Sequence, residues 1–213
     1  MAIETGDADT AWTGPVGAPL VILLHDYMGR LPYLAHYGIR LAGEGYRVAL
    51  PDFHGGRSTT SPDHALMMLY ERYRDTPGAL AIIDDAVRKA RAEGSPKVGL
   101  VGFSMGVSLA LEYAATHDGV AGIVAHYGKP LREDTVVDVP VLFQQGADDE
   151  EDGIRPAERF RLAMAARGNL EIEVFDFDAL HGFANQQRED RFDLTAAGVA
   201  WERTLGFLQR TVR

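Results

Sequence analysis

The amino-acid sequence predicts an α/β fold: a doubly wound, mostly parallel sheet with helices on both faces, forming a three-layer α/β/α sandwich. Short runs rich in Val, Ile and Leu alternate along the chain with longer stretches of helical periodicity. Several runs are apolar on consecutive residues, as parallel strands covered on both faces must be. Strands and helices that alternate in this way form parallel sheets through right-handed crossovers.

The expected strands are the apolar runs 20–24, 46–50, 97–101, 120–125, 139–143 and 170–175. The expected helices between and after them are 31–44, 65–74, 79–93, 104–116, 155–167 and 195–210. The third of these helices stops at Gly94, a residue type that commonly follows a last helical turn. The Gly-, Ser-, Thr- and Pro-rich segment 55–63 is expected to be a loop at the carboxyl end of a strand.

Composition and charge limit the class of protein. The 213 residues are 46% hydrophobic and 24% charged, which is ordinary for a globular protein, and we expect one domain over 1–213. The formal net charge of −10 argues against a non-specific nucleic-acid binder, because phosphate binding needs a basic face. The chain has no cysteine, which excludes disulfides, thiolate metal sites and a cysteine nucleophile.

The sequence shows no pattern that is typical of a targeting segment or a membrane span. The N-terminal stretch lacks a basic flank followed by a long apolar run, so we expect no signal peptide. The apolar runs are far shorter than the ~20 residues that a membrane span needs. We therefore expect a soluble cytoplasmic protein, a monomer or a homodimer, without a membrane or nucleic-acid partner.

A serine in the string Gly102-Phe103-Ser104-Met105-Gly106 stands between an expected strand and an expected helix. The string alone is weakly specific, but the order strand, sharp turn, helix is that of the nucleophile elbow in α/β-hydrolases. Small residues beside the serine let neighbouring backbone approach, and the helix N-terminus offers N–H groups where an oxyanion develops. The alternative is an ordinary N-cap serine. We expect Ser104 to be a nucleophile.

A serine nucleophile needs a base, and in this fold the chain order is Ser, then acid, then His. Only His117, His126 and His181 follow Ser104. His117 stands near the end of the elbow helix, and no strand end carrying an acid separates His126 from Ser104. His181 stands in a loop between the last strand and the last helix, from which its ring can reach the carboxyl ends of the strands. We expect His181 to be the base, the alternative being a solvated loop histidine.

The acid is expected after the expected strand 139–143, which is the strand before the last one. There the chain turns at Gly146 and continues as Ala147-Asp148-Asp149-Glu150. Asp149 fits the Gly-x-x-Asp spacing, with Asp148 as the fallback. Asp149 would hold one tautomer of the imidazole and stabilise the imidazolium. We interpret the remaining acids as a solvated turn: Asp148, Glu150 and Glu151.

The loop after the first strand, 25–29, is expected to supply a second oxyanion donor. We assign the backbone N–H groups of Tyr27 and Met105 to the oxyanion hole. His25 is interpreted as a structural histidine that bridges loops rather than as a base. The side chains expected around the substrate pocket are His25, Asp26, Tyr127, Phe183 and Asn185.

Two other functions fit the pattern less well. The side chains of His25, Asp26, Asp52 and His54 stand at expected strand ends and could hold a divalent ion. No pair of them has the helical i, i+4 ligand spacing, so we expect no metal and no other cofactor. A nucleotide-binding domain is disfavoured because the first strand is followed by neither Gly-x-Gly-x-x-Gly nor a P-loop lysine.

These residues together resemble the dienelactone hydrolase family over about Leu20 to Leu208. The stretches that carry the resemblance are His25-Asp26-Tyr27-Met28-Gly29 with Pro51-Asp52-Phe53, the elbow at Ser104, and His181-Gly182-Phe183-Ala184 with Trp201-Glu202-Arg203-Thr204-Leu205-Gly206-Phe207-Leu208. The resemblance implies an α/β-hydrolase fold and cofactor-free hydrolysis of a lactone to a keto-acid. It also implies a Cys, His, Asp triad.

The chain departs from the family pattern at the site. Ser104 stands at the position of the family's cysteine, Asp26 at that of a glutamate that tunes the thiol, and Asn185 at that of a carboxylate-binding arginine. A serine has a far higher pKa than a thiol, so His181 must activate it as a general base. The residues that could supply a replacing cation are Arg72, Arg74 and Arg188.

The sequence therefore predicts a serine hydrolase that cleaves a small carboxylic ester or lactone through an acyl-enzyme. The small substrate follows from a chain that leaves little room for a large cap domain. An acyl-peptidase is the alternative among enzymes. A catalytically silent α/β-hydrolase that binds small molecules or partners is the alternative outside them.

Overall fold

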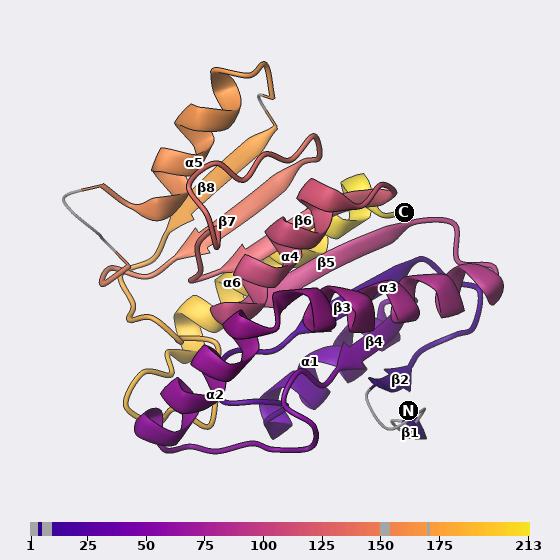
Figure 1. Cartoon of the computed structure of the whole chain (residues 1–213), viewed down its shortest axis with the longest axis horizontal. Coiled ribbons are helices and arrows are strands. Elements are labelled where there is room, and N and C mark those ends of the chain that lie inside the picture. Colours follow the sequence, from indigo (N-terminus) through magenta and orange to yellow (C-terminus); the bar gives the residue numbers. More distant parts are fainter. Residues whose placement is uncertain (1–3, 6–9, 150–153, 170) are drawn as a thin grey trace.

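The computed structural model describes residues 4–5, 10–149, 154–169 and 171–213 (Figure 1). The strands are β1 (Glu4–Thr5), β2 (Thr10–Thr13), β3 (Leu20–Leu24), β4 (Arg47–Pro51), β5 (Val98–Phe103), β6 (Val120–His126), β7 (Val141–Gln145) and β8 (Ile172–Asp176). The helices are α1 (Pro32–Gly43), α2 (Pro62–Arg74), α3 (Thr76–Ala92), α4 (Met105–Thr116), α5 (Pro156–Ala165) and α6 (Leu194–Thr211). All six expected strands and all six expected helices are present, with ends shifted by a few residues.

The described strands form one sheet in the order β1-β2-β4-β3-β5-β6-β7-β8. From β4 to β8 neighbouring strands are parallel, and β2 pairs antiparallel with β4. The sequence did not predict β1 and β2. The strand β2 has one large apolar side chain, Trp12, which is buried under the cations of Arg47 and Lys89. A single buried aromatic residue gives no apolar run, so the pattern that revealed the other strands was missing here.

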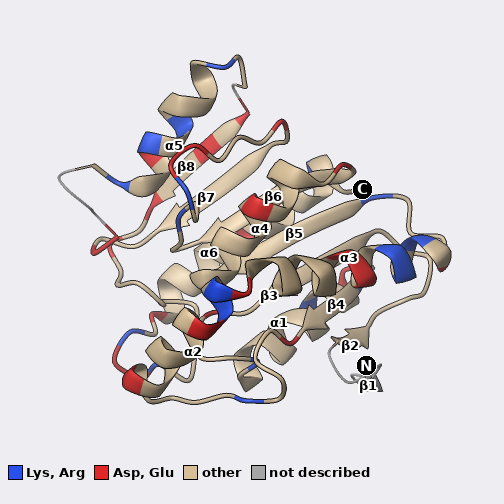
Figure 2. Cartoon of the chain, viewed as in Figure 1, with Lys and Arg blue, Asp and Glu red and all other residues tan. Residues whose placement is uncertain are grey.

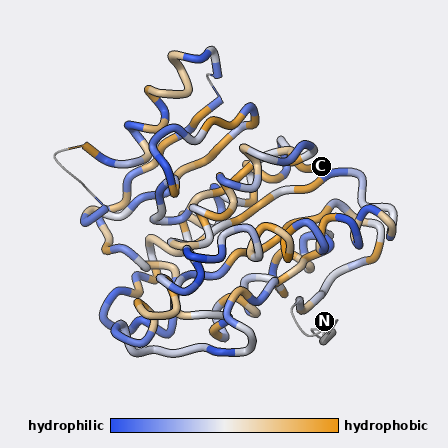
Figure 3. The backbone as a smooth tube through the Cα atoms, in the orientation of Figure 1, coloured by the Kyte–Doolittle hydropathy of each residue, from blue (hydrophilic) through white to orange (hydrophobic). Residues whose placement is uncertain are grey.

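The helices cover both faces of the sheet, as predicted. Helices α3, α4 and α5 pack in one apolar cluster on one face, and α1 and α6 pack in a second cluster on the other. The central strands β3, β5, β6 and β7 carry no Asp, Glu, Lys or Arg, and residues of these four types lie on helices, loops and outer strands such as β8 (Figure 2). The backbone tube is correspondingly hydrophobic along these strands (Figure 3). In the part of the chain that is described, no helix is both long and apolar enough to cross a bilayer.

Two helices begin three residues earlier than the sequence predicts. Helix α2 begins at Pro62, whose fixed φ suits the first helical turn. Helix α3 begins at Thr76, because the Asp75 side chain accepts a hydrogen bond from the Gly78 N–H at 3.1 Å and caps the helix. Apolar periodicity locates the buried turns of a helix, whereas capping residues decide where it begins.

Candidate active site

A cavity of about 530 Å³ opens at the carboxyl ends of the parallel strands, where ligand sites of open α/β sheets commonly lie. Its walls come from the ends of different strands: Tyr27 follows β3, Ser104 follows β5, Tyr127 follows β6 and His181 follows β8. Strand β6 thus separates the strand that leads into Ser104 from β7 and β8, which lead into the loops carrying Asp149 and His181.

Ser104 stands at a strained turn between β5 and α4. Its φ of 50° and ψ of −110° lie in a region that residues with a side chain rarely adopt. The glycine at 106 makes the turn possible, since a Cβ there would lie 2.2 Å from the Leu24 carbonyl oxygen of β3. Met105 is the first residue of α4, so its N–H has no acceptor inside the helix. The serine and the start of the helix therefore both face the cavity.

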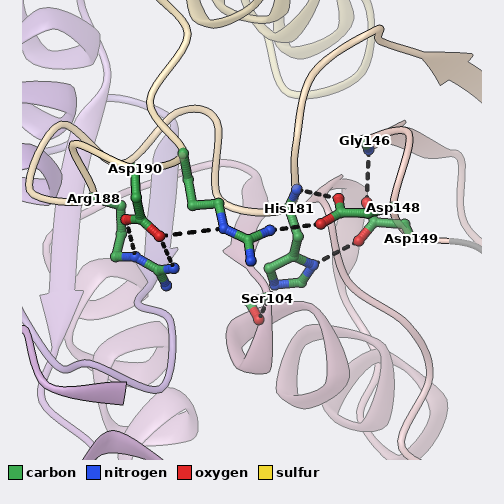
Figure 4. Close-up of polar contacts among 8 residues, drawn as sticks. Ser104, Gly146, Asp148, Asp149, His181, Arg188 and Asp190 are labelled. Atoms are coloured by element: carbon green, nitrogen blue, oxygen red, sulfur yellow. Dashed lines mark hydrogen bonds and ion pairs between the residues drawn. The ribbon is translucent and has the colours of Figure 1, made fainter.

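Ser104, His181 and Asp149 form a continuous chain of hydrogen bonds (Figure 4). Ser104 Oγ lies 2.9 Å from His181 Nε2, and His181 Nδ1 lies 2.6 Å from Asp149 Oδ1. The other carboxylate oxygen of Asp149 accepts a hydrogen bond from the Gly146 N–H at 2.6 Å, which fixes the carboxylate. With an acceptor facing Nδ1, the imidazole proton resides there and Nε2 is left to accept the serine proton.

Asp148 lies in an exposed turn, as the sequence suggested, but it also makes two contacts that the sequence did not show. Its Oδ1 accepts a hydrogen bond from the His181 backbone N–H at 2.5 Å, and its Oδ2 lies 2.6 Å from Arg191 Nη1. The ion pairs continue from Arg191 to Asp190 at 3.4 Å and from Asp190 to Arg188 at 2.8 Å (Figure 4). Burial would raise the pKa of Asp148, but the bonds from His181 and Arg191 outweigh burial and lower that pKa. Glu150 and Glu151 lie outside the described residues.

Comparison with known proteins places the chain in a family. The dienelactone hydrolase family profile matches residues 8–212. The chain belongs to the dienelactone hydrolase family. It is similar to a carboxymethylenebutenolidase of Rhodococcus opacus, with 29% identity over 97% of this chain and 83% of that protein. A carboxymethylenebutenolidase of Pseudomonas putida is 27% identical over 90% of this chain and 85% of that protein.

Solved structures share the fold. A dienelactone hydrolase-like promiscuous phosphotriesterase from metagenomic libraries matches with a TM-score of 0.78 at 20% identity, covering 96% of this chain and 92% of that chain. An esterase of Pyrococcus furiosus matches with a TM-score of 0.66 at 17% identity, covering 96% and 87%. The predicted α/β-hydrolase fold is confirmed. Membership of the dienelactone hydrolase family makes this chain a hydrolase.

The side chains expected around the pocket of this family member divide into two groups. Tyr127 lines the cavity, as do Tyr27 and Met105. Four others lie behind the lining instead and are almost fully buried: His25, Asp26, Phe183 and Asn185. The sequence expectation that these four side chains line the pocket differs from the structure, because sequence alone does not show which loop side chains turn away from the cavity.

Asp26 is held in a buried network of hydrogen bonds. One of its oxygens accepts a hydrogen bond from the Met28 N–H at 2.8 Å. The other accepts hydrogen bonds from the Tyr33 hydroxyl at 3.1 Å and from the Asn185 amide at 2.8 Å. Burial raises the pKa of Asp26, and these bonds offset part of the rise. The network joins the loop after β3 to the loop after His181.

His25 bridges two loops. Its Nδ1–H donates to the Asp26 carbonyl oxygen at 2.6 Å, and its Nε2 accepts from the Phe53 N–H at 3.0 Å. A ring that accepts at Nε2 and donates at Nδ1 is neutral, and burial lowers its pKa to about 3. The carboxylate of Asp52 accepts from the His54 and Gly56 N–H groups. Across the described ranges, no group of three or more His, Cys, Asp or Glu side chains is placed to hold a metal ion.

Two arginines line the cavity, and both are ion-paired. Arg188, one of the three cations suggested by the sequence, pairs with Asp190. Arg191, which the sequence did not suggest, pairs with Asp148 and Asp190. Arg72 and Arg74 belong to α2 and do not contribute to the described lining. Arg191 was missed because its place at the cavity depends on its ion pair with Asp148, which is distant in the chain.

Gln145 also lines the cavity and was not predicted as a site residue. It is the last residue of β7, next to Gly146, the residue at which the chain turns toward Asp149. Its polar side chain is fully buried. A pair of glutamines at the end of an otherwise apolar buried strand is unusual, and that was the available sequence signal.

Proposed function

We propose that this member of the dienelactone hydrolase family is a serine hydrolase that cleaves a small carboxylic ester or lactone through an acyl-enzyme on Ser104. The observation that carries the proposal is the 2.9 Å contact between Ser104 Oγ and His181 Nε2, with Asp149 on the far side of the ring. This is the arrangement by which a general base activates a hydroxyl of high pKa.

In the proposed first step, Ser104 Oγ forms a bond to the substrate carbonyl carbon while its proton passes to His181 Nε2. The carbonyl oxygen becomes an oxyanion, which the backbone N–H groups of Tyr27 and Met105 stabilise. When the bond to the leaving oxygen breaks, His181 returns the proton to that oxygen. The products of this step are the alcohol and the acyl-enzyme.

In the second step, water attacks the acyl carbon while His181 accepts one of its protons. The tetrahedral intermediate then collapses, and the proton passes from His181 to Ser104 Oγ as that oxygen leaves. With a lactone, the alcohol and the acid remain in one product. The cavity volume of about 530 Å³ suits a small substrate.

The test measures hydrolysis of p-nitrophenyl esters from acetate to octanoate, and of dienelactone, by wild type and Ser104→Ala. We expect turnover that is greatest for short acyl chains and that Ser104→Ala abolishes. Dienelactone is included because the relatives named above are carboxymethylenebutenolidases. Turnover of dienelactone would extend the substrate range to lactones of that kind.

A fluorophosphonate probe with peptide mapping supplies the matched control. Ser108 lines the same cavity, but its hydroxyl donates to the Lys129 carbonyl oxygen at 2.8 Å rather than to an imidazole. We expect the probe to modify Ser104 in wild type and in Ser108→Ala, and nothing in Ser104→Ala. A folded wild-type protein that neither labels nor turns over any ester would contradict the proposal and favour a silent binding module.

A further inference from the structure

Gln145 is a buried polar side chain whose hydrogen-bonding groups are unmet within the described parts of the chain. Its exposed fraction is 0%, and neither its amide nitrogen nor its amide oxygen has a partner there. The neighbouring Gln144 turns to the opposite face of the sheet, where its amide nitrogen donates to the Ala200 carbonyl oxygen at 3.2 Å and to Thr204 Oγ1 at 3.0 Å. Gln145 instead faces α4 and α5 and lines the cavity.

The register of the sheet fixes where Gln145 stands relative to the nucleophile. Phe103 of β5 is level with His126 of β6, and His126 is level with Gln144 of β7. The next residues on the three strands are Ser104, Tyr127 and Gln145. Adjacent strands lie about 4.8 Å apart, so Gln145 stands two strand spacings, roughly 10 Å, from Ser104. A substituent a few bonds from the scissile carbonyl would reach it.

A carboxamide offers donors and an acceptor together, and leaving both unmet in a buried place is costly. The matching ligand group is therefore one that both donates and accepts. A neutral group fits better than an anion, because the Asp149 carboxylate lies nearby, accepting from the N–H of Gly146, the residue that follows Gln145. Taking an anion out of water next to that carboxylate would be unfavourable.

We propose that Gln145 is a specificity-determining residue that binds an amide or hydroxyl group of the substrate, about two strand spacings from the scissile carbonyl. The inference deepens the proposed function and rests on it. It predicts that the enzyme prefers esters that carry such a neutral hydrogen-bonding group over esters of equal length that are purely alkyl. The residue that causes this preference lies at the end of β7, whereas the nucleophile elbow follows β5.

The test compares two p-nitrophenyl esters of equal chain length, those of N-acetyl-β-alanine and hexanoic acid. A second pair, 2-acetamidoethyl acetate and pentyl acetate, places the amide on the alcohol side. The measured quantity is the ratio of kcat/KM within each pair. We expect a ratio in favour of the amide in at least one pair, and Gln145→Leu to reduce that ratio about tenfold. An unchanged ratio in both pairs would overturn the proposal.

Thermal stability separates recognition from a structural role. Leucine resembles glutamine in size and buries no polar atom, so Gln145→Leu should keep or raise Tm. The matched control is Gln144→Leu, which removes hydrogen bonds to α6 and should lower Tm without changing the ratio. A large fall in Tm for Gln145→Leu would show that the side chain serves the fold, contrary to the proposal.

Equilibrium binding measures the contribution of Gln145 separately from catalysis. The same ester pairs are titrated into Ser104→Ala, with and without Gln145→Leu, and the Kd values are compared. Tighter binding of the amide ester that Gln145→Leu abolishes would support the role of Gln145 even if wild type turned over no ester. If no ester is turned over, equal Kd values for both esters would overturn the role of Gln145.

Discussion

Asp149 interacts with His181 through one oxygen and with the backbone through the other. The 2.6 Å contact with Nδ1 selects the tautomer whose Nε2 can accept the serine proton, and the Gly146 N–H keeps the carboxylate from rotating away. The contact with His181 is the proposed catalytic one, and the contact with Gly146 is structural. An asparagine retains an oxygen for Gly146 but cannot stabilise an imidazolium.

Asp149→Asn should therefore lower kcat for p-nitrophenyl acetate by roughly three to four orders of magnitude while leaving the protein folded. Stopped-flow or long-time hydrolysis assays give kcat, and circular dichroism with Tm shows whether the fold is kept. A fall in kcat of less than tenfold in a folded variant would show that Asp149 does not orient the base.

Sequence reasoning reached Ser104, Asp149 and His181 because each stands in a loop directly after an expected strand, and parallel strands bring those loops to one edge. Their chemical roles stay predictions. The same reasoning missed the contact between Asp148 and Arg191, which are far apart in the chain and meet only when two loops fold against each other. It also expected Phe183 and Asn185 to line the cavity, because sequence position alone does not give the direction of a loop side chain.

At the scale of elements, the elbow depends on how closely α4 approaches β3. The added Cβ of an alanine at 106 would meet backbone atoms of Leu24 at 2.2 and 2.7 Å, and backbone atoms of a central strand cannot move aside easily. Gly198 of α6 is the contrasting case, since nothing lies within 4 Å of a Cβ there. The helix position 106 therefore requires a residue without a side chain, whereas position 198 does not.

Gly106→Ala should destabilise the protein by roughly 3 kcal/mol, whereas Gly198→Ala should stabilise it by about 0.5–1 kcal/mol, because alanine is the better helix former. Urea unfolding followed by tryptophan fluorescence measures both. If the two substitutions changed the free energy of unfolding equally, the close approach of α4 to β3 would not be the reason for the glycine at 106.

The loop that carries His181 is held by Asp148 through the His181 backbone N–H, and Arg191 holds Asp148 in turn. Asp148→Asn weakens this ionic contact and lets the imidazole shift relative to Ser104. We expect kcat to fall roughly 10- to 100-fold, because small displacements of a catalytic group are costly. A double variant with Arg191→Met should be little worse than either single variant, because both substitutions break the same contact.

The control for Asp148→Asn is Glu173→Gln, which breaks an exposed ion pair with Arg210 on the far side of the protein. It should leave kcat unchanged, since exposed ion pairs contribute little and this one lies away from the cavity. Equal effects of the two substitutions on kcat would count against a positioning role for Asp148.

At the scale of the whole molecule, three buried histidines favour folding at neutral pH. Burial lowers the pKa of His25 and His126 to about 3 and that of His54 to about 4, from an ordinary value of 6.5. Between pH 6.5 and these lowered pKa values, the three histidines bind protons in the unfolded chain but not in the folded chain. The stability that these histidines support is therefore fully present above pH 6.5 and is lost as the pH falls toward 4 and 3.

The free energy of unfolding should accordingly decrease as the pH is lowered from 6.5 to 4.5. His126 stacks on Phe103 with ring centroids 4.6 Å apart, so His126→Phe keeps the shape and removes the titration. The slope of stability against pH in this variant should be shallower by about 1.4 kcal/mol per pH unit. Urea titrations at several pH values give the slope, and His64→Gln, which removes an exposed histidine, is the control. Identical slopes for His126→Phe and wild type would refute the argument.

The overall architecture was the most predictable feature, because buried parallel strands produce a strong apolar pattern. The strands from β3 to β8 were all expected, and helix starts such as Thr76 shifted because a cap rather than periodicity decides them. The edge strand β2 was missed, since its pairing with β4 depends on a partner and not on its own composition.

The position of β6 between Ser104 and the pair Asp149 and His181 has a practical consequence. A break in the connection between β6 and β7 would leave Ser104 in one fragment and both Asp149 and His181 in the other, so under the proposed mechanism neither piece could hydrolyse an ester alone. The second fragment would still carry α6, whose Trp201 packs on Tyr37 of the first with ring centroids 4.9 Å apart. Ester hydrolysis would then appear only on reassembly, which would make the split chain a colorimetric reporter of the proximity of any two proteins fused to its halves.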